Sequence, residues 1–154
     1  MENIKLLCSV LRLYESNFRL LHWNAIGKDF NDSHNSITAK YYEDLGDTID
    51  KVAEIGCMLS VMPLNYAETL EELNNSNRNF LIVDSKKLYS RKQIIELSDI
   101  MLADICKLLV ECLQDQTVQL PENIGIKADL ESILAQYTLE YRFINKRRMM
   151  CVEE

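Results

Sequence analysis

The stretch that decides the fold is LNYAETLEELNNSNRNFLIVDSKKLY, residues 64–89, because the apolar periodicity found on both sides of it weakens here. Asn65 followed three residues later by Glu68 is the pattern of a helix cap, and it predicts one short helix over 66–73. The run NNSNRN at 74–79 predicts a loop. Because this link is too long for a hairpin turn, we expect it to cross the length of a helical bundle.

Two long helices are predicted before this link and two after it. Apolar residues recur every three or four positions over about 3–25 and 33–62, and again over about 91–115 and 125–148. No segment shows the alternation of a strand. The expected breaks and caps are Gly27, Asp32 or Ser33, Pro63, Ser90 with Gln93, and Pro121. The sequence therefore predicts an all-α, ferritin-like four-helix bundle with a long crossover that carries a short helix.

The composition fits a single globular domain, which we expect to span residues 1–154. The chain is 47% hydrophobic and 27% charged, with only 4 Gly and 2 Pro. Its net charge of −7 argues against a phosphate backbone as the main partner. No apolar run is long enough to cross a bilayer, and the N-terminal residues do not form a signal peptide. We therefore expect a cytoplasmic protein without a membrane partner.

The cysteines and the one basic run have ordinary structural interpretations. The chain has 5 cysteines and no CxxC motif. They lie mostly at apolar positions of predicted helices, which indicates buried, reduced thiols. The run KRR at 146–148 is expected to complement the dipole of the last helix.

Both histidines flank the first interhelical loop. His22 lies near the end of the first predicted helix and His34 near the start of the second, so an antiparallel hairpin can bring them to one end of the bundle. Neutral imidazoles are good ligands for iron, zinc and copper. The alternative is that these are helix-end or surface histidines without a ligand.

Four carboxylates follow on the second predicted helix. Glu43, Asp47, Asp50 and Glu54 share one helix face, because each residue turns the helix by about 100°. Such a face is either a solvated surface or a source of oxygen ligands. Its place on the same hairpin as the histidines favours iron, which binds both imidazole and carboxylate.

This stretch resembles the Dps proteins, miniferritins that oxidise iron in a hollow shell of twelve subunits. The family hallmark is His-Trp, ten residues, His, three residues, Asp, ten residues, Asp, three residues, Glu. In this chain the order is His22-Trp23, ten residues, His34, three residues, Thr38, eleven residues, Asp50, three residues, Glu54. Further matches are Asn24, Gly27 and Phe30 in HWN-x-x-G-x-x-F, and Pro63 with TLEEL at 69–73 in the crossover helix.

The resemblance implies a metal site shared between two subunits. His22 and His34 of one chain would face Asp50 and Glu54 of the partner subunit and bind non-haem iron, as one ion or as a di-iron pair. Trp23 would take up stray oxidising equivalents, or it would pack in the dimer seam.

The resemblance also implies a ferroxidase that uses peroxide or oxygen and stores or detoxifies iron under oxidative stress. The implied assembly is a homodimer that builds a dodecameric shell. Some family members compact DNA through basic tails. This chain has no such tail, so direct DNA binding is not expected.

Two departures from the family pattern bear on the site. Thr38 stands where the family has its first Asp, and one extra residue separates His34 from Asp50. In an unbroken helix, that residue would turn the second Asp and the Glu by about 100°. Ile49 and Ala53 would then take the places of the ligands.

We therefore predict a π-bulge or another helix irregularity beside Thr38, between Ile37 and Tyr41, which absorbs the extra residue. The alternative is a ferritin-like shell or scaffold protein with a degenerate, inactive metal site.

Overall fold

The computed structural model describes residues 2–150 and consists of helices joined by loops. In chain order they are α1 (Glu2–Trp23), π-helix η1 (Asp32–Thr38), α2 (Ala39–Met58), α3 (Tyr66–Asn75), α4 (Arg91–Leu113), 3₁₀-helix η2 (Pro121–Asn123), α5 (Ile124–Gln136), π-helix η3 (Tyr137–Arg142) and α6 (Phe143–Met150). These residues contain no strand beyond an isolated bridge between Ala25 and Tyr89.

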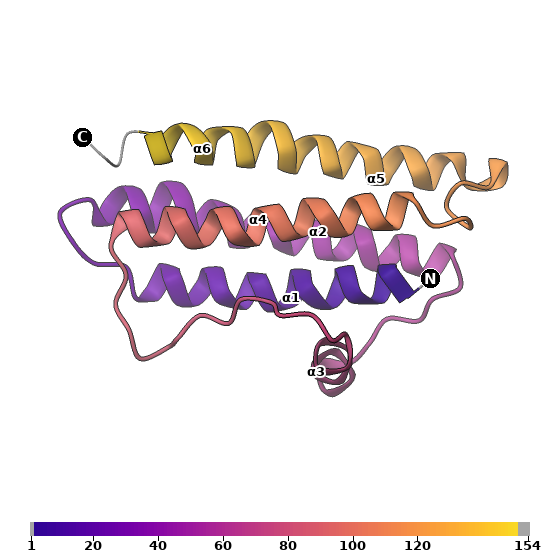
Figure 1. Ribbon diagram of the computed structural model, residues 1–154, viewed down its shortest axis with the longest axis horizontal. Helices are drawn as coiled ribbons and strands as arrows, with labels where there is room; N and C mark the ends of the chain where they lie inside the picture. The colour runs from indigo at the N-terminus through magenta and orange to yellow at the C-terminus, as the bar shows by residue number, and fades with distance from the viewer. Residues whose placement is uncertain (1, 151–154) are drawn as a thin grey trace.

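The helices form four rods along the long axis of the molecule (Figure 1). The rods are α1, η1 continued by α2, α4, and α5 continued by η3 and α6. The crossover between α2 and α4 returns along α1, and α3 is seen end-on, so its axis lies across the bundle (Figure 1). The predicted ferritin-like bundle with a long crossover is confirmed.

The apolar faces of α1 and α4 form much of the core. Leu11, Phe18 and Met101 are fully buried there, and burial of a side chain of this size stabilises the fold by about 1.5–3 kcal/mol. Asn17 on α1 is also buried, where its amide donates to the carbonyl of Leu81 at 2.8 Å. This bond fixes the crossover against α1.

The cap predicted at Asn65 before α3 is observed as a full capping box, and the capping box predicted at Ser90 before α4 is present. The expected caps of the second long helix are wrong. Asp32 instead forms an ion pair with Arg91, at 2.7 Å between Oδ2 and Nε. The hydroxyl of Ser33 is buried without a partner among the described residues.

The second long helix ends at Met58, before the predicted end at residue 62. Ser60 takes a positive φ of 65°, and the N–H of Val61 bonds to the carbonyl of Gly56 at 2.8 Å. With the 3.0 Å bond from the N–H of Ser60 to the carbonyl of Cys57, this is a Schellman motif. The prediction placed the end too late because the motif usually has Gly where this chain has Ser.

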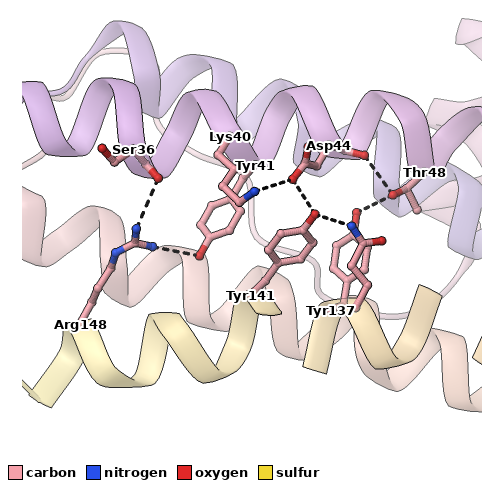
Figure 2. Close-up of polar contacts among 9 residues, drawn as sticks. Ser36, Lys40, Tyr41, Asp44, Thr48, Tyr137, Tyr141 and Arg148 are labelled. Atoms are coloured by element: carbon pink, nitrogen blue, oxygen red, sulfur yellow. Dashed lines mark hydrogen bonds and ion pairs between the residues drawn. The ribbon is translucent and has the colours of Figure 1, made fainter. Parts of the chain in front are cut away.

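The last rod, predicted as one helix over 125–148, contains the π-helix η3. Tyr137 and Tyr141 on η3 are both 1% exposed, and their hydroxyls reach α2 (Figure 2). Tyr141 donates to Oδ2 of Asp44 at 2.5 Å, and Tyr137 donates to the hydroxyl of Thr48 at 2.8 Å. Lys40 Nζ lies 3.3 Å from the same Asp44 oxygen. These contacts fix the last rod against α2.

The basic run at 146–148 contributes a further contact to α2. The guanidinium of Arg148 lies 3.5 Å from the hydroxyl of Tyr41 and 3.4 Å from the carbonyl oxygen of Ser36 (Figure 2). Arg147 lies over the ring of Phe143 at 5.3 Å. Two of the three basic side chains therefore have partners within the chain.

The four described cysteines are free thiols. Cys106 and Cys112 are buried as expected, and burial raises the pKa of Cys112 to about 12. Cys8 is half-buried, whereas Cys57 is exposed, so the expectation of a buried thiol is wrong for Cys57. Cys151 lies outside the described residues. No helix within residues 2–150 has the length and hydropathy needed to span a membrane.

Removing the Tyr141 hydroxyl should loosen the last rod. Burial and the bond to Asp44 raise the pKa of Tyr141, so its phenol remains a proton donor. We expect Tyr141→Phe to lower the free energy of unfolding by about 1.5–3 kcal/mol, since Asp44 loses a charge-assisted hydrogen bond. Urea unfolding measures the loss. The control is Tyr66→Phe, at a 71% exposed ring, and equal stability of the two variants would contradict this account.

Candidate metal site

The loop between the two histidines is fixed by the end of the crossover. Asn24 Nδ2 donates to the carbonyl oxygens of Ser85 and Lys87 at 3.1 and 2.9 Å. The N–H of Tyr89 donates to the carbonyl of Asn24 at 2.9 Å. Gly27 has a φ of +104°, which a residue with a side chain would adopt only with strain. The HWN-x-x-G motif therefore has a structural role in shaping this hairpin.

The second rod opens as the π-helix η1. The N–H of Ala39 bonds to the carbonyl of His34, five residues earlier. A π-turn accommodates one residue more than an α-turn. The predicted irregularity is therefore confirmed, although it lies at Asp32–Thr38 and not between residues 37 and 41. From Ala39 to Met58 the helix is a regular α-helix.

The hairpin stacks the rings of His22 and His34, hereafter the histidine pair. Their centroids are 3.5 Å apart and their planes differ by 13°. Nδ1 of His22 lies 2.8 Å from the carbonyl oxygen of His34, and Nδ1 of His34 lies 2.8 Å from the carbonyl oxygen of His22. Each imidazole is thus hydrogen-bonded to the backbone of the other residue.

These bonds decide which ring nitrogen carries the proton. A carbonyl oxygen only accepts, so each Nδ1 carries hydrogen and each Nε2 keeps its lone pair in the neutral ring. Within residues 2–150 neither Nε2 has a hydrogen-bond partner, and neither is a buried unpaired atom. Both lone pairs are therefore available to a ligand that approaches from solvent.

Aromatic side chains flank the histidine pair. The ring of Phe30 stacks on His34 at 4.8 Å, and Tyr42 meets His22 edge-on at 5.2 Å. The guanidinium of Arg19 lies 4.6 Å from the centroid of Tyr42. These contacts restrict rotation of both imidazoles.

The surroundings of His22 favour its neutral form. Burial lowers the pKa of His22, and the bond to the His34 carbonyl opposes that shift only in part. The charge on Arg19 lowers this pKa further, whereas Glu43 raises it. Since a metal ion binds neutral imidazole, His22 stays competent to bind at lower pH than an ordinary histidine.

The stacking limits how the histidine pair can bind metal. A metal ion lies in the plane of its imidazole, at about 2.1 Å for zinc. Planes 13° from parallel with centroids 3.5 Å apart do not converge on such a point. The pair as held can therefore bind two ions, one on each ring, but it cannot chelate a single ion.

The predicted carboxylate ligands lie elsewhere on the chain. Asp50 and Glu54 are exposed, as are Glu43 and Asp47. Asp50 follows His34 by sixteen residues. The regular part of the helix, from Ala39 to Asp50, already spans about 16 Å, so Asp50 lies at least that far along the rod from the histidine pair. In the described part of the chain, no three His, Cys, Asp or Glu side chains are close enough to hold a metal ion. One chain therefore does not assemble the predicted ligand set.

The regular part of α2 shows which residue shares the face of Asp50. Eleven residues turn an α-helix by about three turns plus 20°, so Ala39 aligns with Asp50, and Thr38 aligns with Ile49. Thr38 is fully buried, and Ile49 lines an apolar groove beside α1. Counted back from Asp50, the place expected for the first Asp therefore falls on Ala39, whereas counted forward from His34 it falls on Thr38.

Trp23 is the last residue of α1, and its side chain is 65% exposed. Within residues 2–150 it makes no ring contact with another aromatic side chain. Its redox role and its packing in a dimer seam both stay predictions.

Sequence reasoning missed the second neighbour of His22, which is the hydroxyl of Thr38 at 3.0 Å. From its spacing to His34, Thr38 is expected only to stand where the family has its first Asp. A Thr hydroxyl in a helix commonly bonds a carbonyl of the preceding turn. That tendency, applied to the carbonyl of His34, is the signal that could have placed Thr38 behind the histidine pair.

The bundle and its crossover form a ferritin-like fold, and this fold is shared with the Dps proteins. Helicobacter cinaedi CAIP matches it with a TM-score of 0.82 and 20% identity, over 96% of this chain and 97% of that one. For Dps from Staphylococcus aureus the values are 0.78 and 15%, over 96% and 92%.

Dps from Vibrio cholerae O1, a member of a broad superfamily of ferritin-like diiron-carboxylate proteins, gives a TM-score of 0.77 and 17% identity, over 96% of this chain and 86% of that one. No protein-family model and no curated protein matches the sequence. At these identities the comparisons show a shared fold.

Acid should destabilise the metal-free protein partly through His22. Because folding lowers the pKa of His22, the unfolded chain takes up this proton first as the pH falls. The contribution of neutral His22 to the free energy of unfolding is complete above a pH of about 6.5, the pKa of an unperturbed histidine. It is lost as the pH falls through the lowered pKa of the folded protein.

His22→Asn cannot titrate and keeps a donor near the place of Nδ1. We expect its free energy of unfolding to fall less steeply than that of the wild type from about pH 7 to pH 5. Urea unfolding at a series of pH values measures both slopes, and identical slopes would contradict the assignment.

Proposed function

We propose that this protein binds ferrous iron at a site shared between two subunits, oxidises it, and stores or detoxifies the ferric product inside a hollow shell. One observation carries the proposal: His22 and His34 present two free Nε2 lone pairs on the fold of the Dps proteins. Imidazole nitrogen and carboxylate oxygen together suit iron.

The ligand set would be completed by Asp50 and Glu54 of the partner subunit. Both residues are exposed in the isolated chain, so a second chain can reach them. The stacked rings support the di-iron alternative over a mononuclear site, because each ring can bind its own ion. Two ferrous ions would then supply the two electrons that reduce hydrogen peroxide to water. Oxygen is the alternative oxidant.

We propose that the partner is a second copy of the chain and that the dimer builds a dodecameric shell in the cytoplasm. Large apolar side chains near the metal face support self-association. Those exposed in the hairpin beside the histidine pair are Trp23, Ile26 and Phe30. Trp23 would accept stray oxidising equivalents from the neighbouring site. Direct DNA binding and a membrane partner are not part of the proposal.

A shell or scaffold protein with an inactive site is the second candidate. Ala39 is the observation that favours it, because it removes one anionic ligand from the face of Asp50. The site would then have two imidazoles and two carboxylates as ligands. It would bind iron more weakly than a site with a third carboxylate.

Ferrous oxidation separates the two candidates. We expect the purified protein to accelerate oxidation of ferrous iron by hydrogen peroxide or oxygen, measured by absorbance of the ferric product. His22→Ala with His34→Ala should reduce the rate to the spontaneous rate, because two neutral ligands are lost. A wild-type rate equal to the spontaneous rate would leave only the scaffold function.

Co-expression of two inactive variants tests whether the site is shared. One variant carries His22→Ala with His34→Ala, and the other carries Asp50→Asn with Glu54→Gln. In a twofold dimer, random pairing restores an intact site at about a quarter of positions. Partial recovery of oxidation is therefore expected, and no recovery would contradict a site between subunits.

A further inference from the structure

We infer that Thr38 is a positioning residue for the metal site, which gives the Nδ1 proton of His22 a second acceptor beside the carbonyl of His34 and so helps to keep Nε2 free. The inference deepens the proposed function and depends on it for the identity of the metal. The first test of the inference uses the metal-free protein, so the inference and the proposed function can fail separately.

The hydroxyl of Thr38 is enclosed by oxygen acceptors and one ring nitrogen. Thr38 is fully buried, and its Oγ1 lies 2.8 Å from the carbonyl oxygen of Ser33 and 3.0 Å from that of His34. The single hydroxyl hydrogen goes to one of these carbonyls. The lone pairs of Oγ1 therefore face Nδ1 of His22 at 3.0 Å and accept its proton.

The π-helix creates this arrangement. In an α-helix, the carbonyl of His34 would accept from the N–H of Thr38, four residues later. In η1 it accepts from the N–H of Ala39 instead, and it also faces the hydroxyl of Thr38 and Nδ1 of His22. The extra residue that disturbs the family spacing is thus what turns Thr38 inward.

The two imidazoles are not held equally. His34 Nδ1 has one acceptor, the carbonyl of His22, whereas His22 Nδ1 has both the His34 carbonyl and Thr38 Oγ1. Loss of the Thr38 hydroxyl should therefore affect His22 more than His34. This asymmetry distinguishes positioning by Thr38 from a general loosening of the hairpin.

Fixing the proton on Nδ1 matters because a metal ion and a proton compete for Nε2. A ring that loses one of two Nδ1 acceptors holds its proton there less firmly, so a larger share of the rings carries hydrogen on Nε2 and cannot bind metal. Loss of such an orienting partner typically weakens metal binding by about 10–100-fold. Thr38 would thus act on the metal through His22 without touching it.

Three variants isolate the hydroxyl. Thr38→Val keeps the shape of the side chain and removes the hydroxyl, and Thr38→Ser restores the hydroxyl. The matched control is Thr48→Val on the same rod, since Thr48 is 5% exposed and its hydroxyl bonds to the carbonyl of Asp44 at 3.0 Å. That control loses a buried hydroxyl away from the histidine pair.

The first readout is the ¹⁵N NMR spectrum of the histidine-labelled, metal-free protein at a pH where both rings are neutral. In the wild type we expect His22 with hydrogen on Nδ1 and none on Nε2. In Thr38→Val the Nδ1 form should stay predominant, because the His34 carbonyl remains, but the share of His22 with hydrogen on Nε2 should rise, with a smaller change at His34. Thr38→Ser and Thr48→Val should match the wild type.

The second readout is binding of Co²⁺, followed by its visible absorption. Affinity for Co²⁺ should fall in Thr38→Val, by less than the about 10–100-fold typical when an orienting partner is lost altogether, and should return in Thr38→Ser. A tautomer shift in a protein that does not oxidise iron would support the inference and refute the proposed function.

Three results would overturn the inference. The first is a wild-type His22 with its proton on Nε2, which needs no variant. The second is a Thr38→Val protein with unchanged His22 signals. The third is weaker Co²⁺ binding without a tautomer change, which indicates structural loosening.

Discussion

The site depends on the two hydrogen bonds by which each histidine donates to the backbone carbonyl of the other. These bonds hold the rings 3.5 Å apart and keep both Nε2 lone pairs free. Three neighbouring features support these bonds. Asn24 fixes the loop, and Phe30 and Tyr42 flank the rings. The π-helix η1 turns the His34 carbonyl toward His22. A hairpin of ordinary α-helical geometry would not present that carbonyl in the same way.

Much of the fold was predictable from the sequence, because helix periodicity and capping are local signals. The caps at Asn65 and Ser90 and the long crossover are observed as predicted. The end of α2 was not predicted correctly, since Ser60 takes a positive-φ conformation that is usually adopted by Gly. The π-helix η3 was missed altogether, because its tyrosines are stabilised by Asp44 and Thr48, roughly ninety residues away in sequence.

That the two histidines meet at the hairpin was predictable from the sequence, whereas their stacked geometry was not. Spacing alone identified His22 and His34 and required an irregular helix near Thr38. It could not show whether the extra residue lies before or after Thr38, and that order decides whether Thr38 or Ala39 shares the face of Asp50. The π-helix decides it, because it ends at Thr38 and the helix from Ala39 to Asp50 is regular. The chain thus contributes two imidazoles at one place and exposed carboxylates at another, and a second subunit would have to unite them.

The most direct measurement of this account is anomalous diffraction at the cobalt edge from crystals of the protein grown with Co²⁺. The account predicts metal between two subunits, bound through Nε2 of His22 and Nε2 of His34 on separate ions, with Asp50 or Glu54 of the partner subunit as oxygen ligands. Metal bound through Nδ1, one ion held by both rings, or cobalt confined to places away from the histidine pair would contradict it.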